Sequence, residues 1–240
     1  INDDVTALQN MSGNLAGYYA LGSNIDAAGT STWNGNGSGG YYGFAPVGYW
    51  SVPFNGAFDG LGHTITGLTI NRPSTNYVGL FGYTVLATSN VGLVGGSVTG
   101  NNEVGGLVGY NDYNGSIANS YWDTQTSGRP GCTAGYGSGG CTGKTTAEMM
   151  QQATFSGFDF TNVWNVVPGI SYPYLKWQFS GTPQVLSGTA TGLGGGKTIQ
   201  AIANGTDLAK TFTGANGFYY FALPGNSVPN GNTLVTYVAG

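Results

Sequence analysis

The chain has 240 residues, and its composition excludes several classes of protein. It holds 45 glycines, charged residues make up only 7 %, and the formal net charge is −4. The six Lys and Arg residues are scattered, so the sequence offers no basic patch for nucleic acid and no polybasic membrane anchor. Because aromatic residues reach 13 % and recur throughout, the composition is not that of a disordered chain.

Export is an expectation from the first residues and from the hydropathy of the chain. No run of about 18 consecutive apolar residues occurs, so the sequence predicts no transmembrane helix and no membrane insertion. The chain begins at Ile1 without a charged segment followed by an apolar one. We therefore expect that a leader has been removed or that the chain is part of a longer protein.

The first residues are typical of a short helix. Asp3 and Asp4 can cap its start, and Val5, Leu8 and Met11 follow at helical spacing. Such an amphipathic helix would cover one end of the fold.

Residues 18–21 and 24–26 are predicted as short strands, and a long loop follows them. Residues 27–43 consist almost entirely of Gly, Ser, Thr and Asn. This loop is a candidate contact surface because it contains the aromatic residues Trp33, Tyr41 and Tyr42. The alternative is that these rings fold back onto the body of the protein.

Asp59 and His63 most resemble a catalytic pair, because His63 is the only histidine and a carboxylate lies close to it in sequence. Nucleophilic catalysis would also need an activated Ser or Cys, and glycoside hydrolysis would need two carboxylates across a cleft. We expect both side chains to bond the local backbone in a turn. The other acidic residues follow no calcium-binding repeat, so no metal or cofactor is predicted, although a calcium ion at a turn stays an open alternative.

Residues 76–122 contain one sequence pattern twice. The two copies are closest at 77–83 and 104–110, which read YVGLFGY and VGGLVGY. A weaker copy precedes them at 54–60. Matching positions recur roughly every 23 to 29 residues, a period that is typical of stacked repeats.

The apolar runs of these repeats hold about three to five residues between Gly or Asn, which suits a short strand and is too short for a helix. Glycine also lets the backbones of neighbouring coils approach closely. We therefore predict an all-β fold, a parallel β-helix (β-solenoid) over residues 1–180 with short capping helices. The predicted core of the repeats includes Leu80, Phe81, Val91, Leu107, Val108 and Ile117.

The repeats also resemble a known family. GLFG at 79–82 and GLVG at 106–109 are similar to the GLUG repeat, and FDGLGHTI at 58–65 resembles the segment that usually precedes it. Such repeats occur in large bacterial surface proteins similar to filamentous haemagglutinin-type adhesins. The resemblance covers about residues 1–177. It implies a parallel β-helix outside the cell and an adhesive or scaffolding role, without implying a ligand.

Cys132 and Cys141 are the only cysteines and lie in a Gly-rich loop. Because a typical structural zinc site needs four ligands, we predict that the two form a disulfide in an oxidising compartment. Further on, residues 145–148 read as a capping box that opens a short helix. An aromatic-rich segment that ends at Trp177 is expected to close the last coil.

The pattern changes after a linker at residues 181–183. Strand-like segments follow at 185–191, 198–203, 210–213, 217–223 and 233–239. Residues 184–240 are predicted as a small immunoglobulin-like β-sandwich, incomplete because such sandwiches usually have about seven strands. An incomplete sandwich leaves an exposed edge that pairs with another strand. The candidate assembly strand consists of Leu234, Val235, Thr236, Tyr237 and Val238.

The sequence thus predicts a non-enzymatic extracellular structural or adhesive module of a bacterial surface protein, with a host or cell-surface ligand as partner. The alternative is a subunit that assembles head to tail with copies of itself into a filament by strand complementation. A weaker alternative is a polysaccharide-acting β-helix enzyme, which would need a cleft lined by several charged residues. The scarcity of charge argues against it.

Overall fold

A computed structural model describes the chain except residues 3, 62, 86, 87, 90, 91, 95, 133, 136, 137, 178 and 240, with no side chains described at 86–95 and 133–139. The first half is made of short strands and turns. Its elements are α1 (Val5–Gln9), η1 (Asn10–Gly13), β1 (Tyr18–Ala20), β2 (Ile25–Asp26), η2 (Ala28–Thr32), β3 (Ala57–Asp59), β4 (Thr64–Thr66), β5 (Thr69–Asn71), β6 (Phe81–Thr84), β7 (Thr88–Ser89), β8 (Gly92–Val94), β9 (Ser97–Thr99), β10 (Val108–Asn111) and β11 (Ser116–Asp123).

The second half begins with short elements and the seven-residue strand β13, and it ends with five strands of five to seven residues. Its elements are α2 (Thr124–Ser127), β12 (Ala134–Gly135), β13 (Ser138–Lys144), η3 (Glu148–Met150), η4 (Gln152–Thr154), β14 (Trp164–Asn165), β15 (Tyr174–Leu175), β16 (Gln184–Thr189), β17 (Thr198–Ala203), β18 (Thr206–Phe212), β19 (Phe218–Leu223) and β20 (Leu234–Val238).

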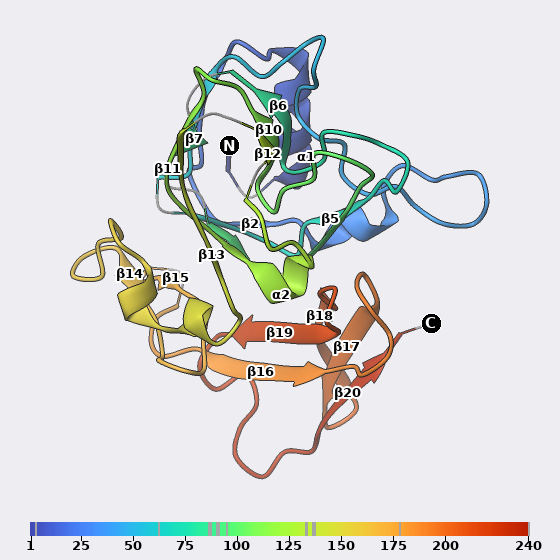
Figure 1. The fold of residues 1–240 in the computed structure, drawn as a ribbon. Helices are drawn as coiled ribbons and strands as arrows, with labels where there is room; N and C mark the ends of the chain where they lie inside the picture. The colour runs from blue at the N-terminus through green and yellow to red at the C-terminus, as the bar shows by residue number, and fades with distance from the viewer. Residues whose placement is uncertain are drawn as a thin grey trace.

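The strands of the first half pair in parallel. The largest sheet has the order β1-β3-β7-β11-β8-β4-β2, with β13 beside β11, and smaller parallel sheets are β12-β10-β6 and β5-β9. In Figure 1 these strands lie around the upper part of the molecule, and β16, β17, β19 and β20 lie below them, with α2 between the two groups.

The predicted parallel β-helix is wrong. The two repeat copies do pair in parallel, with Val108 opposite Phe81 and Tyr110 opposite Tyr83. This pairing joins the four-residue strands β6 and β10, which form a three-stranded sheet with β12, and one further parallel bridge links Val78 to Val104. Because the copies differ in spacing, extra residues form loops, and the short strands are divided between one eight-stranded sheet and two smaller parallel sheets. Among the described residues no sheet closes and no regular coil repeats, although the all-β class is consistent with the structure.

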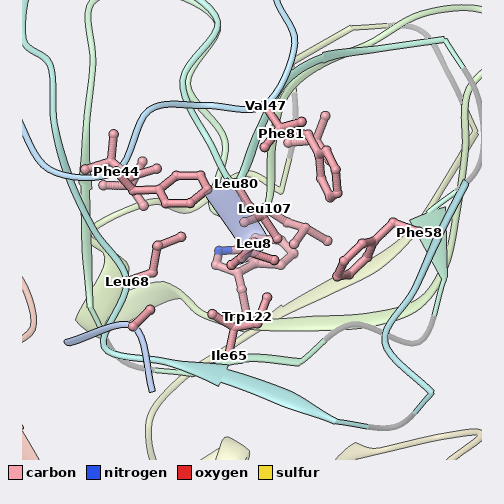
Figure 2. Close-up of a cluster of buried hydrophobic side chains, with 14 of the residues drawn as sticks. Leu8, Phe44, Val47, Phe58, Ile65, Leu68, Leu80, Phe81, Leu107 and Trp122 are labelled. Atoms are coloured by element: carbon pink, nitrogen blue, oxygen red, sulfur yellow. The ribbon is translucent and has the colours of Figure 1, made fainter. Parts of the chain in front are cut away.

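One cluster of buried side chains forms the core of the first half. Figure 2 shows side chains from the surrounding chain segments pointing into this cluster. The Phe81 ring lies 4.8 Å from that of Phe54 and 5.3 Å from that of Phe58. Of the residues named for the repeat core, the buried ones are Leu80, Phe81, Leu107, Val108 and Ile117. Val91 lies outside the described residues.

Helix α1 contributes to the same cluster, as the spacing of its apolar residues predicts. The carboxylate of Asp4 accepts a hydrogen bond from the backbone N of Thr6 at 2.7 Å, so Asp4 caps the helix. Leu8 of α1 and Met11 of the following 3₁₀-helix η1 are fully buried. The helix therefore begins at its cap and covers the core with one face.

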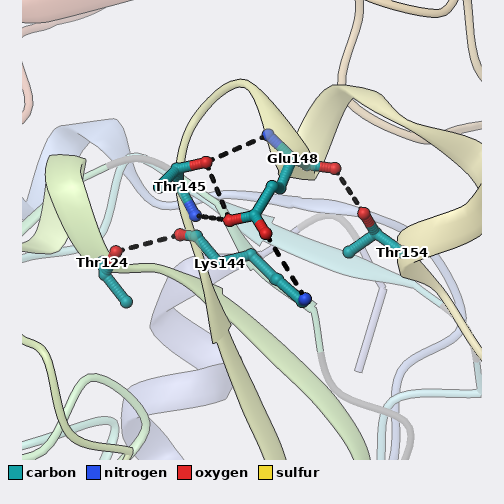
Figure 3. A network of polar contacts seen from close by, with 5 residues as sticks. All are labelled: Thr124, Lys144, Thr145, Glu148 and Thr154. Atoms are coloured by element: carbon teal, nitrogen blue, oxygen red, sulfur yellow. Dashed lines mark hydrogen bonds and ion pairs between the residues drawn. The ribbon is translucent and has the colours of Figure 1, made fainter.

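The predicted capping box at residues 145–148 is confirmed (Figure 3). Glu148 accepts a hydrogen bond from the backbone N of Thr145 at 2.9 Å, and the Thr145 hydroxyl accepts one from the backbone N of Glu148 at 3.2 Å. The turn that it opens is the 3₁₀-helix η3. Met149 and Met150 on this turn are buried in a second cluster, together with Tyr121 and Phe155.

Residues 184–238 form two antiparallel sheets. β16 pairs with β19, and β17 lies between β18 and β20. Their shared core is formed by Ile199, Ala201, Phe221 and Leu223. The five strands lie where strand-like segments were predicted, but they make sheets of only two and three strands. The predicted immunoglobulin-like sandwich is therefore replaced by a smaller arrangement, because the chain described here supplies too few strands for two larger sheets.

The two groups of strands contact each other through α2 and the segment around Tyr172. The backbone N of Ala215 donates a hydrogen bond to the carbonyl of Thr126. The Tyr172 ring lies 5.0 Å from the Tyr220 ring and 6.5 Å from the Phe218 ring, edge to face. Aromatic contacts thus connect β19 to Tyr172, whose hydroxyl in turn bonds Asp123 at the end of β11.

Candidate interaction surfaces

The aromatic residues of the loop at residues 27–43 differ in how far they are exposed. Trp33 is partly buried and packs against the main core, as the alternative interpretation predicts for it. Tyr41 and Tyr42 are exposed, at 45 % and 42 %. Only these two can offer their rings to a partner.

The base of this loop is fixed by side-chain amides. Asn34 donates to the carbonyl of Gly43 at 2.7 Å, and Asn71 donates to that of Tyr41 at 3.3 Å. The Arg72 guanidinium lies 5.6 Å from the centre of the Tyr42 ring, within reach of a cation–π contact. Desolvation lowers the pKa of Arg72, and the neighbouring Tyr42 opposes this shift.

A second exposed aromatic turn was missed from the sequence. The backbone groups of Tyr49 and Val52 bond each other at 2.9 and 3.0 Å, which closes a tight turn around Trp50. Tyr49, Trp50 and Val52 are 52 %, 64 % and 49 % exposed. The flanking residues Val47 and Phe54 are buried and bridge to β6, so the turn projects from the wall of the core. The bridges on either side of this turn join it to residues far away in the sequence. No turn motif in the neighbouring sequence marks the turn.

Three tyrosines form a row on β6, β10 and the segment before β6. Parallel register places Tyr83 beside Tyr110, and their rings stack at 4.8 Å. Tyr77 lies edge-on to both rings, at 5.6 and 6.1 Å. The Tyr83 hydroxyl donates to the carboxylate of Asp112 at 3.3 Å. Desolvation, followed by the negative charge of Asp112, raises the pKa of Tyr83, so its phenol stays a neutral donor.

A turn follows Asp59, the last residue of β3, and His63 closes it; the predicted bond to the local backbone is shown for the Asp59 side chain, and for the His63 side chain it stays a prediction. The Asp59 carboxylate accepts a hydrogen bond from the backbone N of Leu61 at 2.8 Å. The backbone N of His63 donates to the carbonyl of Gly60 at 2.7 Å. Within the part of the chain that the structure describes, no three His, Cys, Asp or Glu residues gather closely enough to hold a metal ion.

The predicted disulfide between Cys132 and Cys141 is confirmed, with a Cα–Cα distance of 6.3 Å. Cys132 is buried in the main core, and its carbonyl accepts hydrogen bonds from the backbone N of Leu107 and Val108. Cys141 lies on β13, opposite Ser120 of β11. The bond therefore ties the segment beside the second repeat copy to the large sheet.

The candidate assembly strand is β20, which is hydrogen-bonded to β17 along one edge. As far as the structure describes the chain, no strand pairs with its other edge. Leu234, Val235, Tyr237 and Val238 are 38 %, 43 %, 47 % and 44 % exposed. This strand is therefore apolar and accessible on both faces.

No helix in the described ranges is both long and apolar enough to cross a membrane.

No family model matches the chain. Halomucin from Haloquadratum walsbyi (strain DSM 16790 / HBSQ001) is 34 % identical over 157 residues, and the match covers 52 % of this chain. The chain spans only 2 % of the length of halomucin. A candidate immunoglobulin A1 protease from Bacteroides ovatus superposes with a TM-score of 0.37 at 26 % identity, over 51 % of this chain and 36 % of that one. The match to halomucin and the disulfide together indicate a surface-associated, extracellular protein.

Proposed function

We propose that this chain is a non-enzymatic structural and adhesive module of an extracellular surface protein, with a host or cell-surface ligand as its partner. The similarity to halomucin carries this proposal. The disulfide supports it, because such bonds persist in oxidising compartments outside the cell. The resemblance of the GLFG and GLVG segments to GLUG-repeat adhesins points in the same direction.

We assign the adhesive contact to the two exposed aromatic segments, Tyr41–Tyr42 and the turn around Trp50. Tyr and Trp provide large contact areas at low cost in side-chain entropy and are enriched among the residues that dominate binding interfaces. Both segments are held at their bases by hydrogen bonds, so their rings are presented on a fixed support.

The hydrogen bonding of the Asp59 carboxylate supports the proposal that the chain is not an enzyme. Its carboxylate accepts a local backbone hydrogen bond, which is a turn-forming role. A general acid or base would instead need its carboxyl group within reach of a substrate.

A binding assay with purified protein tests adhesion. Immobilised chitin, cellulose and mucin serve as probes, and we expect saturable retention on at least one of them. The double variant Tyr49→Ala/Trp50→Ala should weaken retention about tenfold or more, as expected for aromatic hot spots. Tyr18→Ala is the matched control, because Tyr18 is 89 % exposed and lies outside both segments. Absence of retention on every probe, or equal losses in both variants, would count against the assignment.

A second candidate function is assembly into a filament, and the free apolar edge of β20 favours it. Head-to-tail assembly requires β20 to enter a different edge of the next copy, since only such heterologous contacts propagate. Electron microscopy of the purified chain distinguishes the candidates. Fibres support assembly, and discrete particles at high concentration exclude it.

A further inference from the structure

We propose that β20 pairs antiparallel with β20 of a second copy of this chain, about a two-fold axis at Thr236, and so forms a closed dimer. The inference concerns the strand edge and not the aromatic segments. Its failure therefore leaves the adhesive proposal intact, and a failure of adhesion leaves the dimer intact.

Strand β20 is an unprotected edge of its sheet. Natural edge strands carry charges, prolines or bulges that prevent pairing with other chains. The other strand at the margin of the same sheet, β18, has such protection, because Asp207 and Lys210 lie within it and the β17–β18 register shifts once. Residues 234–238 contain no charge and no proline. The β20 edge is therefore open to a partner.

The sequence of β20 is also complementary to itself. An antiparallel pair centred on Thr236 places Leu234 opposite Val238 and Val235 opposite Tyr237. Four apolar side chains of each copy then meet apolar side chains, and the two Thr236 residues face each other. Aromatic with β-branched and Thr with Thr pairs stabilise antiparallel sheets, and no like charges meet across the axis.

Pairing of two β20 strands would also cover exposed side chains on both faces of each strand. Pairing with β17 puts Leu234 and Thr236 on the face of the buried Ala203 and Ala201. The Thr236 hydroxyl lies 2.9 Å from the Tyr219 hydroxyl of the opposite sheet.

Beside this inner face lies an open groove of about 270 Å³. It is lined by Gln184, Val185, Leu186, Leu223, Val228 and Leu234. In the dimer, the side chains of the partner's β20 that lie on the inner face would extend this face over the groove. On the outer face, Val235 and Tyr237 of the two copies would pack against each other.

Pairing of β20 with β20 of a second copy predicts a closed dimer and not a fibre. When the same surface is used by both copies, a two-fold axis closes the assembly and uses up the edge. The joined β18-β17-β20 sheets would form one six-stranded sheet whose two outer strands are the charged β18 strands. These margins are protected, so growth stops at two copies.

Sedimentation velocity of the whole chain over a range of concentrations tests the proposal, with circular dichroism as the check on folding. Wild-type protein should sediment as a monomer–dimer equilibrium. Tyr237→Lys and Val235→Glu should each raise the dimer Kd about tenfold, because each variant breaks two aromatic–Val pairs. The double variant Val235→Glu/Tyr237→Lys should regain most of the loss, since each Lys then faces a Glu of the partner.

The matched control is Leu193→Lys, a charge at a residue that is 40 % exposed outside β20, which should leave the Kd unchanged. A wild type that is monomeric at all concentrations overturns the proposal, as do fibres. Single variants that dimerise like wild type exclude β20 as the contact, and a double variant without recovery excludes the register.

Discussion

Phe81 is the side chain on which the main core depends most visibly. It is fully buried, and its ring contacts Phe54 and Phe58 of the weaker repeat copy. Leu107 of the second repeat copy is also fully buried in the same cluster. Truncation of either side chain would leave a cavity that a well-packed interior fills only partly.

We therefore expect Phe81→Ala to lower the free energy of unfolding by about 3 to 5 kcal/mol and Leu107→Ala by about 2 to 5 kcal/mol. Urea or thermal unfolding measures both changes. Leu193→Ala is the matched control, because its side chain lies at the surface. Losses under about 1 kcal/mol for both core variants would contradict this description of the core.

Tyr172 and Asp123 form a buried polar pair at the junction of the two halves. The Tyr172 hydroxyl donates to the Asp123 carboxylate at 2.7 Å, and that carboxylate also caps α2 through the backbone N of Gln125 and Thr126. Desolvation and then the charge of Asp123 raise the pKa of Tyr172 well above its ordinary value. Burial likewise raises the pKa of Tyr220.

These shifts predict a loss of stability at high pH. The folded state holds the phenol protons more tightly than the unfolded chain, whose Tyr pKa is about 10, so the stabilisation is complete below about pH 10 and is lost above it. Tyr172→Phe should weaken this pH dependence, and at neutral pH it should cost about 1 to 3 kcal/mol because the Asp123 carboxylate loses a donor.

Urea unfolding between about pH 8 and about pH 11.5 measures the effect. Tyr18→Phe provides the control at an exposed position. An alkaline loss of stability in Tyr172→Phe as large as in the wild type would show that Tyr172 contributes nothing to it.

At the scale of elements, glycines decide how closely the repeat copies approach. A Cβ placed on Gly109 would lie 2.5 Å from the backbone N of Val78 and 2.6 Å from the carbonyl oxygen of Gly82. Both atoms belong to the first copy, so the second copy can lie against it only without a side chain at Gly109. In contrast, nothing lies within 4 Å of a Cβ on Gly29.

Gly109→Ala should therefore destabilise the protein by about 1 to 3 kcal/mol through overpacking, whereas Gly29→Ala should change stability by only a few tenths of a kcal/mol. Thermal unfolding of the two variants gives the comparison. Equal stability of both would mean that the backbones of the copies do not need this close contact.

The disulfide acts at the same scale, because it joins the loop beside β10 to β13. Titration of thiols in the unreduced, denatured protein should find none, and reduction should lower stability by about 2 to 3 kcal/mol. The double variant Cys132→Ser/Cys141→Ser separates loss of the bond from effects of the reductant. Two reactive thiols in the untreated protein would contradict the pairing.

The capping box shows why local features could be predicted from the sequence. Thr145 and Glu148 satisfy each other's backbone groups within four residues, and their chemistry depends on little else (Figure 3). Hydrogen bonds from Thr145 lower the pKa of Glu148, and the exposed Lys144–Glu148 ion pair at 3.5 Å is secondary. The cap on α1 and the five C-terminal strands were predictable for the same reason.

At the scale of the whole molecule, sequence patterns were a weaker guide. The similarity between 77–83 and 104–110 predicted that the copies pair, and they do, in register. It could not predict whether successive pairs continue into one solenoid, because that depends on the loops between them. Val47, which bridges to β6 from a distant segment, belongs to no repeat copy, and Phe54, which also bridges to β6, belongs only to the weaker copy. The exposed turn around Trp50 was missed with them.

The central claim for the whole molecule is that it binds a surface ligand without cleaving it. The most direct test incubates the purified chain with each retained probe under saturating conditions and analyses the soluble products for new reducing ends and peptide fragments. Our account predicts retention with no product in the wild type, and unchanged retention in His63→Gln, since His63 lies in a turn. Product formation by the wild type that is lost in His63→Gln would contradict it.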